Sequence, residues 1–384
     1  MNNAQHRVLP ALTGLLLVAA CQPVQQPEQV PPPFVFRTLE LRQKDGRGLP
    51  SWEITSPEAR YDLGRKLATA RSLRGLIYAK GKPLYRLTAS RGLVINDGEV
   101  VQLEGPSRLE RLGPNPLVIT ALRVRWYPRS GRMLLDRQPR ATQKQLELTA
   151  RRAVFDVGQD KLLLSGDPLL VDQGRPRLSL ALRQVQWWAA SGTLMGAGPV
   201  RGERRESGGR HQTLTSPSLS GNSLRQELIL AAPVRVVDAA DGSELRARAS
   251  RIDLAQETIS SDQPFEGQRG SLTLRGQGFT LSSRSTTLVI PRGCELRQPG
   301  DQLLATRCSW NWSTDQVEAR GGVELRRQQN GQVTRAEQLD GRAAKDGSVV
   351  FSQPGGRVTS QFSLPPAARS GPGAPRRSSP PIQL

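Results

Sequence analysis

One residue pattern recurs ten times along this chain, and it constrains the fold more than any other feature of the sequence. The pattern is apolar-x-small-x-x-apolar-x-apolar, and its marker residues stand 27 to 34 positions apart, about 31 on average. Repetition at this period is typical of stacked units that bury an apolar face only together. The markers are Ser56, Ala89, Ala121, Ala150, Leu182, Ser216, Ala249, Gly276, Ala305 and Ala336.

The segment from Leu146 to Pro168 illustrates one unit. Residues 146–150 alternate apolar and polar side chains, the period-two pattern of a half-buried strand. The phase then slips by one residue, so that Ala153 and Phe155 continue the inward set, and such a slip requires a bulge or a bend. Residues 156–159 supply turn chemistry, and a return strand follows. Each unit is therefore predicted to be strand, turn, strand.

Ten such units predict about twenty antiparallel strands in sequential hairpins. Apolar residues make up 36% of the chain and aromatic residues only 4%, so a thin apolar layer between sheets is expected instead of a bulky globular core. Residues 60–74 could be drawn as a helix, but the repeat register predicts strands there. A Pro or Gly pair follows nearly every marker by about 15 to 18 residues, and we expect it to close the unit.

The N-terminus is predicted to carry a lipoprotein signal at residues 1–21. Arg7 is followed by a short apolar run from Leu9 to Ala20, and the run ends in Val-Ala-Ala-Cys. This ending resembles a bacterial lipobox, which implies cleavage before Cys21 and lipidation of its thiol. Two or three acyl chains would anchor the protein stably. The alternatives are an ordinary secretory signal with a chance cysteine, or an uncleaved anchor.

Composition divides the rest of the chain. Residues 22–50 are predicted to be a Pro/Gln-rich tether, transitional from 34 onward, and residues 51–363 the repeat domain. The polar break at 202–212 is either a long hairpin loop or a seam between two half-domains. Residues 364–384 have the composition of a disordered tail.

Cys294 and Cys308 are placed symmetrically about the turn at Pro299-Gly300-Asp301. In a simple hairpin they would face each other across two strands, and an oxidising compartment favours a disulfide. The alternative is a free buried pair.

The sequence gives no reason to expect catalysis, a metal or a cofactor. Beyond the signal segment the one histidine is His211, which we expect to be a solvated loop residue, and no nucleophile motif or phosphate-binding loop occurs. The net charge is +20, but the arginines are spread evenly and no nucleic-acid recognition motif is present, so nucleic acid is not an expected partner. An anionic membrane surface or glycolipid fits this charge better.

At Trp52–Asp62 and again at Leu146–Asp156 the chain resembles the repeat of periplasmic lipopolysaccharide-transport proteins, the LptC, LptA and OstA group. The segment Gly81–Ala89 is also similar to LptC-type chains, and the repeat covers about 310 of the 384 residues. The resemblance implies an all-β fold, a long antiparallel open β-jellyroll that holds lipid A acyl chains between its sheets. It also implies lipopolysaccharide, other Lpt β-jellyroll proteins paired edge to edge, and an inner-membrane ABC transporter as partners.

The chain departs from that family in two ways. A lipobox stands where a transmembrane helix is usual, and the chain is about twice the usual length, so an LptC-like, an LptA-like and a fused bridge protein all stay open. Gln22 after Cys21 is not the Asp that commonly retains lipoproteins at the inner membrane, although an inner-membrane anchor on the periplasmic side is favoured.

Small markers followed by bulky residues predict an apolar trough, in which small residues keep the trough wide. A non-catalytic structural or adhesion repeat with a dry core is the main alternative, and a polysaccharide-cleaving enzyme is a remote one. The residues expected to line the trough are Ile54, Tyr61, Leu87, Ala89, Val94, Ile119, Ala121, Trp126, Leu148, Ala150, Phe155, Leu180, Trp187, Leu214, Leu254, Phe279, Leu281 and Trp310.

Overall fold

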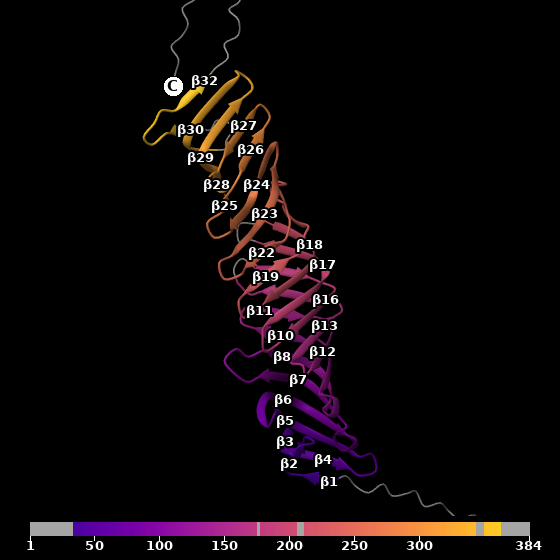
Figure 1. The fold of residues 1–384 in the computed structure, drawn as a ribbon. Helices are drawn as coiled ribbons and strands as arrows, with labels where there is room; N and C mark the ends of the chain where they lie inside the picture. The colour runs from indigo at the N-terminus through magenta and orange to yellow at the C-terminus, as the bar shows by residue number, and fades with distance from the viewer. Residues whose placement is uncertain (1–33, 175–176, 206–210, 343–348, 362–384) are drawn as a thin grey trace, which may run out of the picture.

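The repeats form strands along the whole chain that the structure, a computed structural model, describes: residues 34–174, 177–205, 211–342 and 349–361. The predicted signal segment with Cys21, and the predicted tail beyond 363, lie outside these residues. Thirty-two strands join in one antiparallel sheet, which twists into an elongated stack from the N-terminal to the C-terminal strands (Figure 1). The protein is therefore an all-β, long antiparallel open β-jellyroll.

Bends fold this sheet into two layers that face each other. Ten long strands run through both layers, while each of the other passes is divided by its bend into two short strands. The long strands are β5 (Leu67–Ala79), β6 (Lys82–Ile95), β7 (Val100–Arg111), β8 (Val118–Tyr127), β17 (Thr193–Arg205), β18 (His211–Asn222), β23 (Thr258–Arg269), β24 (Leu272–Ser282), β29 (Gln316–Arg327) and β30 (Gln332–Arg342).

Eleven short strands belong to each layer in the described residues. Layer 1 contains β2 (Leu39–Lys44), β3 (Pro50–Ser56), β10 (Arg140–Gln143), β11 (Leu146–Thr149), β14 (Leu169–Asp172), β15 (Arg177–Ala181), β20 (Val234–Asp238), β21 (Glu244–Ala247), β26 (Cys294–Gln298), β27 (Asp301–Ala305) and β32 (Thr359–Gln361). Layer 2 contains β1 (Phe34–Phe36), β4 (Glu58–Asp62), β9 (Arg132–Asp136), β12 (Arg152–Asp156), β13 (Lys161–Ser165), β16 (Gln184–Trp188), β19 (Glu227–Leu230), β22 (Ser250–Asp253), β25 (Thr287–Ile290), β28 (Arg307–Asn311) and β31 (Val349–Ser352).

The phase slip in the sequence corresponds to the bend between the layers. In the unit from Leu146, β11 pairs with β10 and β14, whereas β12 pairs with β9 and β13, so the strand changes partners where the phase slips. If each bent pair of short strands is counted as one pass, the chain makes twenty-one passes over the described residues, which agrees with the prediction of about twenty strands.

The Pro and Gly pairs do not close the units, as the sequence led us to expect. They lie at the bends of the return strands, for example at the register shift between Glu104 and Ser107 of β7 and at that between Ala197 and Val200 of β17. A bulge leaves a residue unpaired and bends the strand, and Pro lacks the N–H that a continuous ladder needs. These pairs therefore divide the layers, while the turns close the units.

The bends also explain why the marker residues are small. Ser56 and Ser216 are buried beside bends, and each hydroxyl shares its one hydrogen between two backbone carbonyls at 2.7 to 2.9 Å. One carbonyl lies two residues on in the same pass, Glu58 or Ser218, and the other in a neighbouring pass, Arg71 or Ala231. A marker thus lies on the closed side of the jellyroll.

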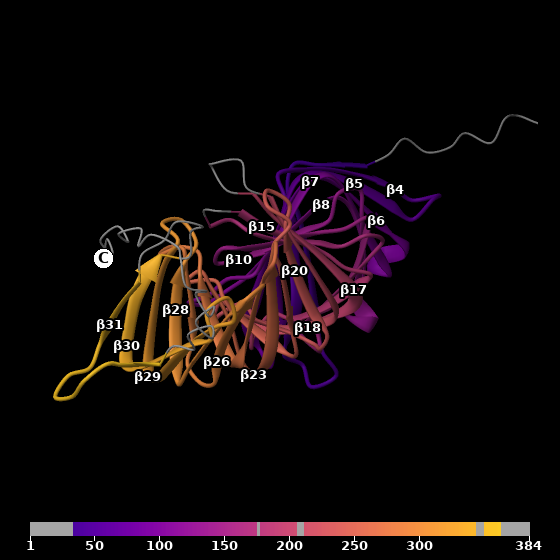
Figure 2. The same ribbon diagram turned by 90° about the horizontal axis from the view of Figure 1, so that it is seen from above.

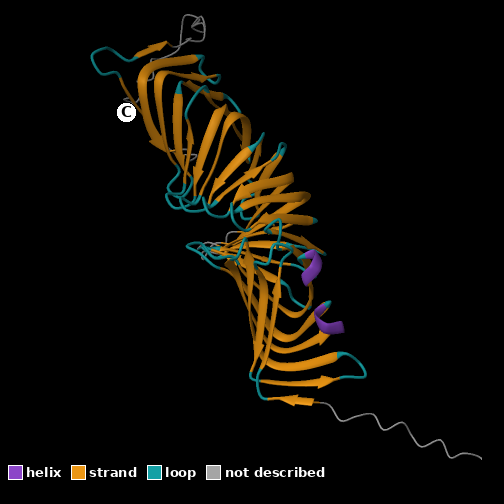
Figure 3. Ribbon diagram, turned by 60° about the horizontal axis from the view of Figure 1, so that its bottom comes forward, coloured by secondary structure: helices purple, strands orange, loops and turns teal. Residues whose placement is uncertain are grey.

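The turn predicted at residues 156–159 connects β12 and β13. Asn96-Asp97-Gly98 forms a single 3-10 turn, η1 (Asn96–Gly98), and a second one, η2 (Pro128–Ser130), precedes Gly131. Both turns connect strands of layer 2 and both are drawn as helix in Figure 3. Residues 60–74, which could have been drawn as a helix, are in β4, a turn and β5.

One predicted boundary needs correction. β1 and β2 pair with β4 and β3, so the sheet already begins at Phe34, within the predicted tether 22–50. Of the two alternatives for the polar break at 202–212, the pairing of β17 with β18 as far as Arg205 and His211 favours the hairpin loop. His211 is consequently a half-buried strand residue and not a solvated loop residue.

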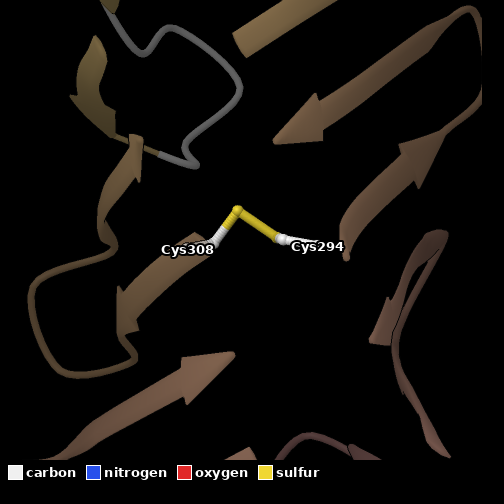
Figure 4. Close-up of a disulfide and its surroundings, with 2 residues drawn as sticks. All are labelled: Cys294 and Cys308. Carbon is white, nitrogen blue, oxygen red and sulfur yellow. A yellow bond between two sulfur atoms is a disulfide. The ribbon is translucent and has the colours of Figure 1, made fainter. Parts of the chain in front are cut away.

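The structure joins Cys294 and Cys308 in a disulfide with a Cα–Cα distance of 5.8 Å (Figure 4). The turn at Pro299-Gly300 joins β26 and β27 in the expected hairpin, but the prediction that the two cysteines face each other in it is wrong. Cys294 of layer 1 lies opposite Ala305, and Cys308 of layer 2 lies opposite Ile290. The bond therefore links the two layers beside a bend.

Candidate apolar trough

The inner face of layer 2 carries one continuous cross-strand row of side chains from one end of the stack to the other. Each residue of this row is the direct register partner of the next, and together they alternate between adjacent antiparallel strands. In order they are Tyr61, Ala68, Val94, Val101, Trp126, Met133, Phe155, Leu162, Trp187, Leu194, Gly221, Leu228, Ile252, Ile259, Leu281, Leu288, Trp310, Val317, Gly341 and Val349.

Layer 1 carries a matching inner row. It begins at Leu41 and Ile54 and stays apolar, apart from glycines, until Thr334 and Ser360 near the C-terminal edge. Between them lie Gly75, Leu87, Leu109, Ile119, Ala141, Leu148, Leu170, Leu180, Gly202, Leu214, Val236, Leu245, Gly267, Leu274, Leu296, Leu303 and Leu325. The two rows together form the candidate trough.

The trough has a closed side and an open side. The bends close one side, and the turns of both layers lie at the other side, which we call the mouth; Figure 2 shows the strands fanning along the stack. From the side of the stack, a ligand could reach the trough only through the mouth, so the side chains at the mouth decide which parts of the trough are accessible.

In the N-terminal half, residues 34–188, aromatic rings fill the space between the layers. Trp52 of layer 1 contacts Trp126 of layer 2 with ring centroids 5.4 Å apart, and Tyr85 contacts Phe155 at 5.2 Å. Tyr85, Phe155 and Trp187 are all fully buried. This packing is that of an ordinary protein core.

Polar contacts across the mouth close this half further. Arg111 Nε of layer 1 donates to Asp160 Oδ2 of layer 2 at 3.2 Å, and the Tyr85 hydroxyl also donates to Asp160. Both charged side chains are about four-fifths buried. Because burial protects an ion pair from screening by water and salt, this tie should hold better than an exposed surface pair.

A second closure lies at the middle of the stack. Gln143 Nε2 donates to the Ala189 carbonyl at 3.2 Å, and the Ser223 hydroxyl donates to Gln143 Oε1 at 2.6 Å. Trp187 Nε1 donates to the same Ser223 oxygen at 3.2 Å. Lys144 Nζ donates to the Leu224 carbonyl at 2.8 Å. We call the network of Gln143, Ser223 and Trp187 the central closure.

We call the edge of each layer that borders the mouth its lip. Beyond the central closure the lip of layer 1 becomes polar. Leu146, Asp172, Leu178, Arg204, Gln212 and Asp238 are successive register partners there. Burial, and to a smaller extent Glu257, raises the pKa of the Asp172 carboxyl, while the Gly174 N–H and Arg204 lower it. Arg204 also donates to the Ser283 hydroxyl of layer 2, across the mouth.

In the C-terminal half, residues 193–361, the trough opens into cavities. One cavity of about 100 Å³ extends from Gln212 to Trp312, and a larger one of about 540 Å³ extends from Asp241 to Val349. Both are lined by Asp241, Arg269 and Trp310, so they adjoin. We call the two together the C-terminal bay.

One cationic side chain crosses the bay at its mouth. Arg269 of layer 1 forms ion pairs with Asp241 Oδ2 at 3.0 Å and with Asp315 Oδ1 of layer 2 at 2.9 Å. Its guanidinium also lies 5.1 Å from the centroid of the Trp310 ring. Arg269 therefore ties the two lips together where the two cavities meet.

The structure gathers most of the predicted trough residues into the two rows. Tyr61, Val94, Trp126, Phe155, Trp187, Leu281 and Trp310 belong to layer 2 and Ile54, Leu87, Ile119, Leu148, Leu180 and Leu214 to layer 1. Phe279 contacts Phe265, 5.1 Å between centroids, and Leu254 lies buried after β22. The small residues Ala89, Ala121 and Ala150 lie beside bends and belong to neither row, and the expectation that they keep the trough wide stays a prediction.

Sequence reasoning missed two features of the site. Tyr85 has the same strand parity as Leu87, and this signal could have found it. The polar lip from Asp172 to Asp238 carries no sequence signal, because polar residues at these positions are normal for strand ends facing water.

No described residues form a group of three or more His, Cys, Asp or Glu side chains that could hold a metal ion. Within the same residues there is no helix with the length and apolar character to cross a membrane.

No protein-family model and no curated protein matches the sequence. Among solved structures, the chain is similar to LptH from Pseudomonas aeruginosa, described as the LptA homologous periplasmic component of the conserved lipopolysaccharide transport device. The identity is 17% and the TM-score 0.26, and the match covers 30% of this chain and 82% of that chain. At this TM-score the likeness carries no weight for function, and the fold class rests on the strand pairings.

Proposed function

We propose that this chain is a periplasmic, membrane-anchored component of a bridge that passes lipopolysaccharide from the inner membrane toward the outer membrane. In this proposal it binds the acyl chains of lipid A between its two layers. The observation that carries the proposal is the pair of continuous apolar rows, which run the length of the stack and reach open cavities in the C-terminal half.

An apolar trough suits transfer of a lipid because acyl chains leave water when they enter it. Passage along the trough needs no catalytic group. Energy would come from an inner-membrane ABC transporter, and lipidation at Cys21 would hold the chain at the membrane.

The ends of the stack support edge pairing with other Lpt β-jellyroll proteins. β31 and β32 form the C-terminal edge, where Val350 is 63% exposed, and β1 at the other end exposes Val35 to the same extent. Unpaired strand edges are templates for another sheet, so each end offers a docking site for a similar fold. We propose that the C-terminal edge extends the trough toward the second membrane.

The filled N-terminal half also fits the alternative, a structural or adhesion repeat with a dry core. The two functions differ in whether lipid reaches the inner row. We would place a photoreactive residue at Trp310 in cells, irradiate, and probe for lipopolysaccharide adducts, with Met195 as the control because it is 54% exposed.

Adducts from position 310 and not from position 195 are expected. No adduct from position 310 in a folded protein, or equal yields from the two positions, would refute lipid transport and favour the dry core.

A further inference from the structure

We infer that the acyl-chain site of this protein is confined to the C-terminal bay and that its occupant is an acylated lipid, with carbonyl oxygens next to its hydrocarbon chain. The inference rests on the proposed function and narrows it, since a trough with uniform access would take lipid in both halves. Under this inference the N-terminal half binds no lipid and serves as a spacer between the membrane anchor and the C-terminal half.

The first support is the difference in side-chain size along the layer 2 row. In the N-terminal half the row contains Trp126, Phe155 and Trp187, each at most 2% exposed. In the C-terminal half the row keeps one aromatic residue, Trp310, which lines both cavities of the bay, and it contains Gly341, which lines the larger one. The N-terminal half also has a cavity at its mouth, of about 880 Å³, but Trp52 and Pro128 are its only large apolar lining residues. The bay differs in that leucines from both layers line its larger cavity.

The second support is the chain of closures at the mouth. Asp160 ties Arg111 and Tyr85 in the N-terminal half, and the central closure of Gln143, Ser223 and Trp187 follows it. A lipid entering the N-terminal half would have to break these buried polar contacts and separate Tyr85 from Phe155. Leaving buried polar groups unpaired is costly, so entry there is disfavoured.

The third support is the chemistry of the larger cavity. Its floor includes Leu272, Leu303 and Leu325, and its volume of about 540 Å³ lies within the roughly 300–1,000 Å³ that ligand sites use. Trp310 Nε1 and Arg327 Nε, both on residues that line it, are buried donor atoms without a hydrogen-bond partner among the described residues.

Buried donors are normally satisfied, so two unsatisfied donors beside an apolar floor fit a ligand that brings acceptor oxygens together with hydrocarbon. An ester or amide carbonyl at the start of an acyl chain has this combination. Trp126 Nε1 in the packed half also lacks a partner, but it lies in a filled core, so the pairing of donors with open space is what distinguishes the bay.

The position of Arg269 determines how an acyl chain would lie in the bay. Its ion pairs with Asp241 and Asp315 join the lips over the junction of the two cavities. An acyl chain would lie beneath this tie, with its polar head outside the lips.

The location of the acyl-chain site is tested by crosslinking purified full-length protein to lipopolysaccharide from a photoreactive residue at Leu303 or at Leu148. Both belong to the layer 1 row, one in the bay and one in the packed half. A second pair, Ser271 and Gln145, repeats the test at exposed turn residues of layer 1, where the substitution does not disturb the core.

Adducts from the bay positions alone are expected. Equal adducts from both halves would overturn the confinement and leave the proposed function standing. No adduct from any of the four positions would refute the proposed function, and this inference with it.

The ligand chemistry is tested with Trp310→Phe and Arg327→Met, which remove the two donors and keep apolar bulk. Displacement of a fluorescent fatty-acyl probe by a palmitoyl ester should weaken roughly tenfold in the double variant, in keeping with the loss of hydrogen bonds. Trp126→Phe is the matched control and should leave displacement unchanged. Equal affinity in the double variant and the wild type would show that the donors do not contact the lipid.

Discussion

Removal of the Cys294–Cys308 disulfide should loosen the C-terminal half of the stack and leave the N-terminal half unchanged. The bond joins residues 14 positions apart and links layer 1 to layer 2 beside a bend. Closing a loop of about fifteen residues stabilises a protein by about 3 kcal/mol in the loop-entropy model. Both cysteines are almost fully buried, at 1% and 3% exposure.

In stacked repeats each unit contacts mainly its neighbours, so a lost crosslink acts locally. A loss of about 3 kcal/mol corresponds to roughly a hundredfold increase in the opening equilibrium of the units around it. We therefore expect faster amide hydrogen exchange in residues 287–311, and unchanged exchange in residues 146–172.

The assay is hydrogen exchange with mass spectrometry on the oxidised wild type, the reduced wild type and Cys294→Ala/Cys308→Ala. The reduced wild type keeps both sulfur atoms, so it isolates the crosslink from the loss of side-chain volume. Titration of the unreduced, denatured protein should find neither of these two thiols free. Two free thiols, or identical exchange in oxidised and reduced protein, would refute the reasoning.

Three further outcomes are expected. Phe155→Ala should cost about 3–5 kcal/mol of unfolding free energy in chemical denaturation, because its fully buried ring contacts Tyr85; a cost below 1 kcal/mol would show that the N-terminal half is not packed. Because burial raises the Asp172 pKa, the folded protein binds that proton more tightly than the unfolded chain, and the carboxylate destabilises the fold as pH rises above about 4. Asp172→Asn should accordingly melt higher than wild type at pH 7 and match it near pH 3; the opposite order at pH 7 would contradict the burial argument. At the C-terminal edge Ser360→Pro should reduce crosslinking to partner jellyrolls more than Ser360→Ala, since proline lacks a ladder donor; equal effects would mean that β32, which pairs with β30, does not also pair with the partner.

The sequence by itself determined the repeat, the alternation of strand faces and the hairpin turns. The phase slip after Ala150 gives the bend between β11 and β12, and the turn at residues 156–159 connects β12 and β13 as expected. These features follow from residues close in the chain, because alternation and turn chemistry are local. For the same reason thirteen of the predicted trough residues fall in the two inner rows, although the sequence could not tell which row each would join.

Only the tertiary structure decided where the trough is closed. The contacts that close it join residues far apart: Arg111 and Asp160 are 49 positions apart, Gln143 and Ser223 are 80 apart, and Arg269 and Asp315 are 46 apart. Which residues meet across the mouth depends on the sheet twist accumulated over several units and on the separation of the layers. A two-residue period fixes which way a side chain faces but not the distance between facing layers, so the packed half and the open bay arise from the same repeat.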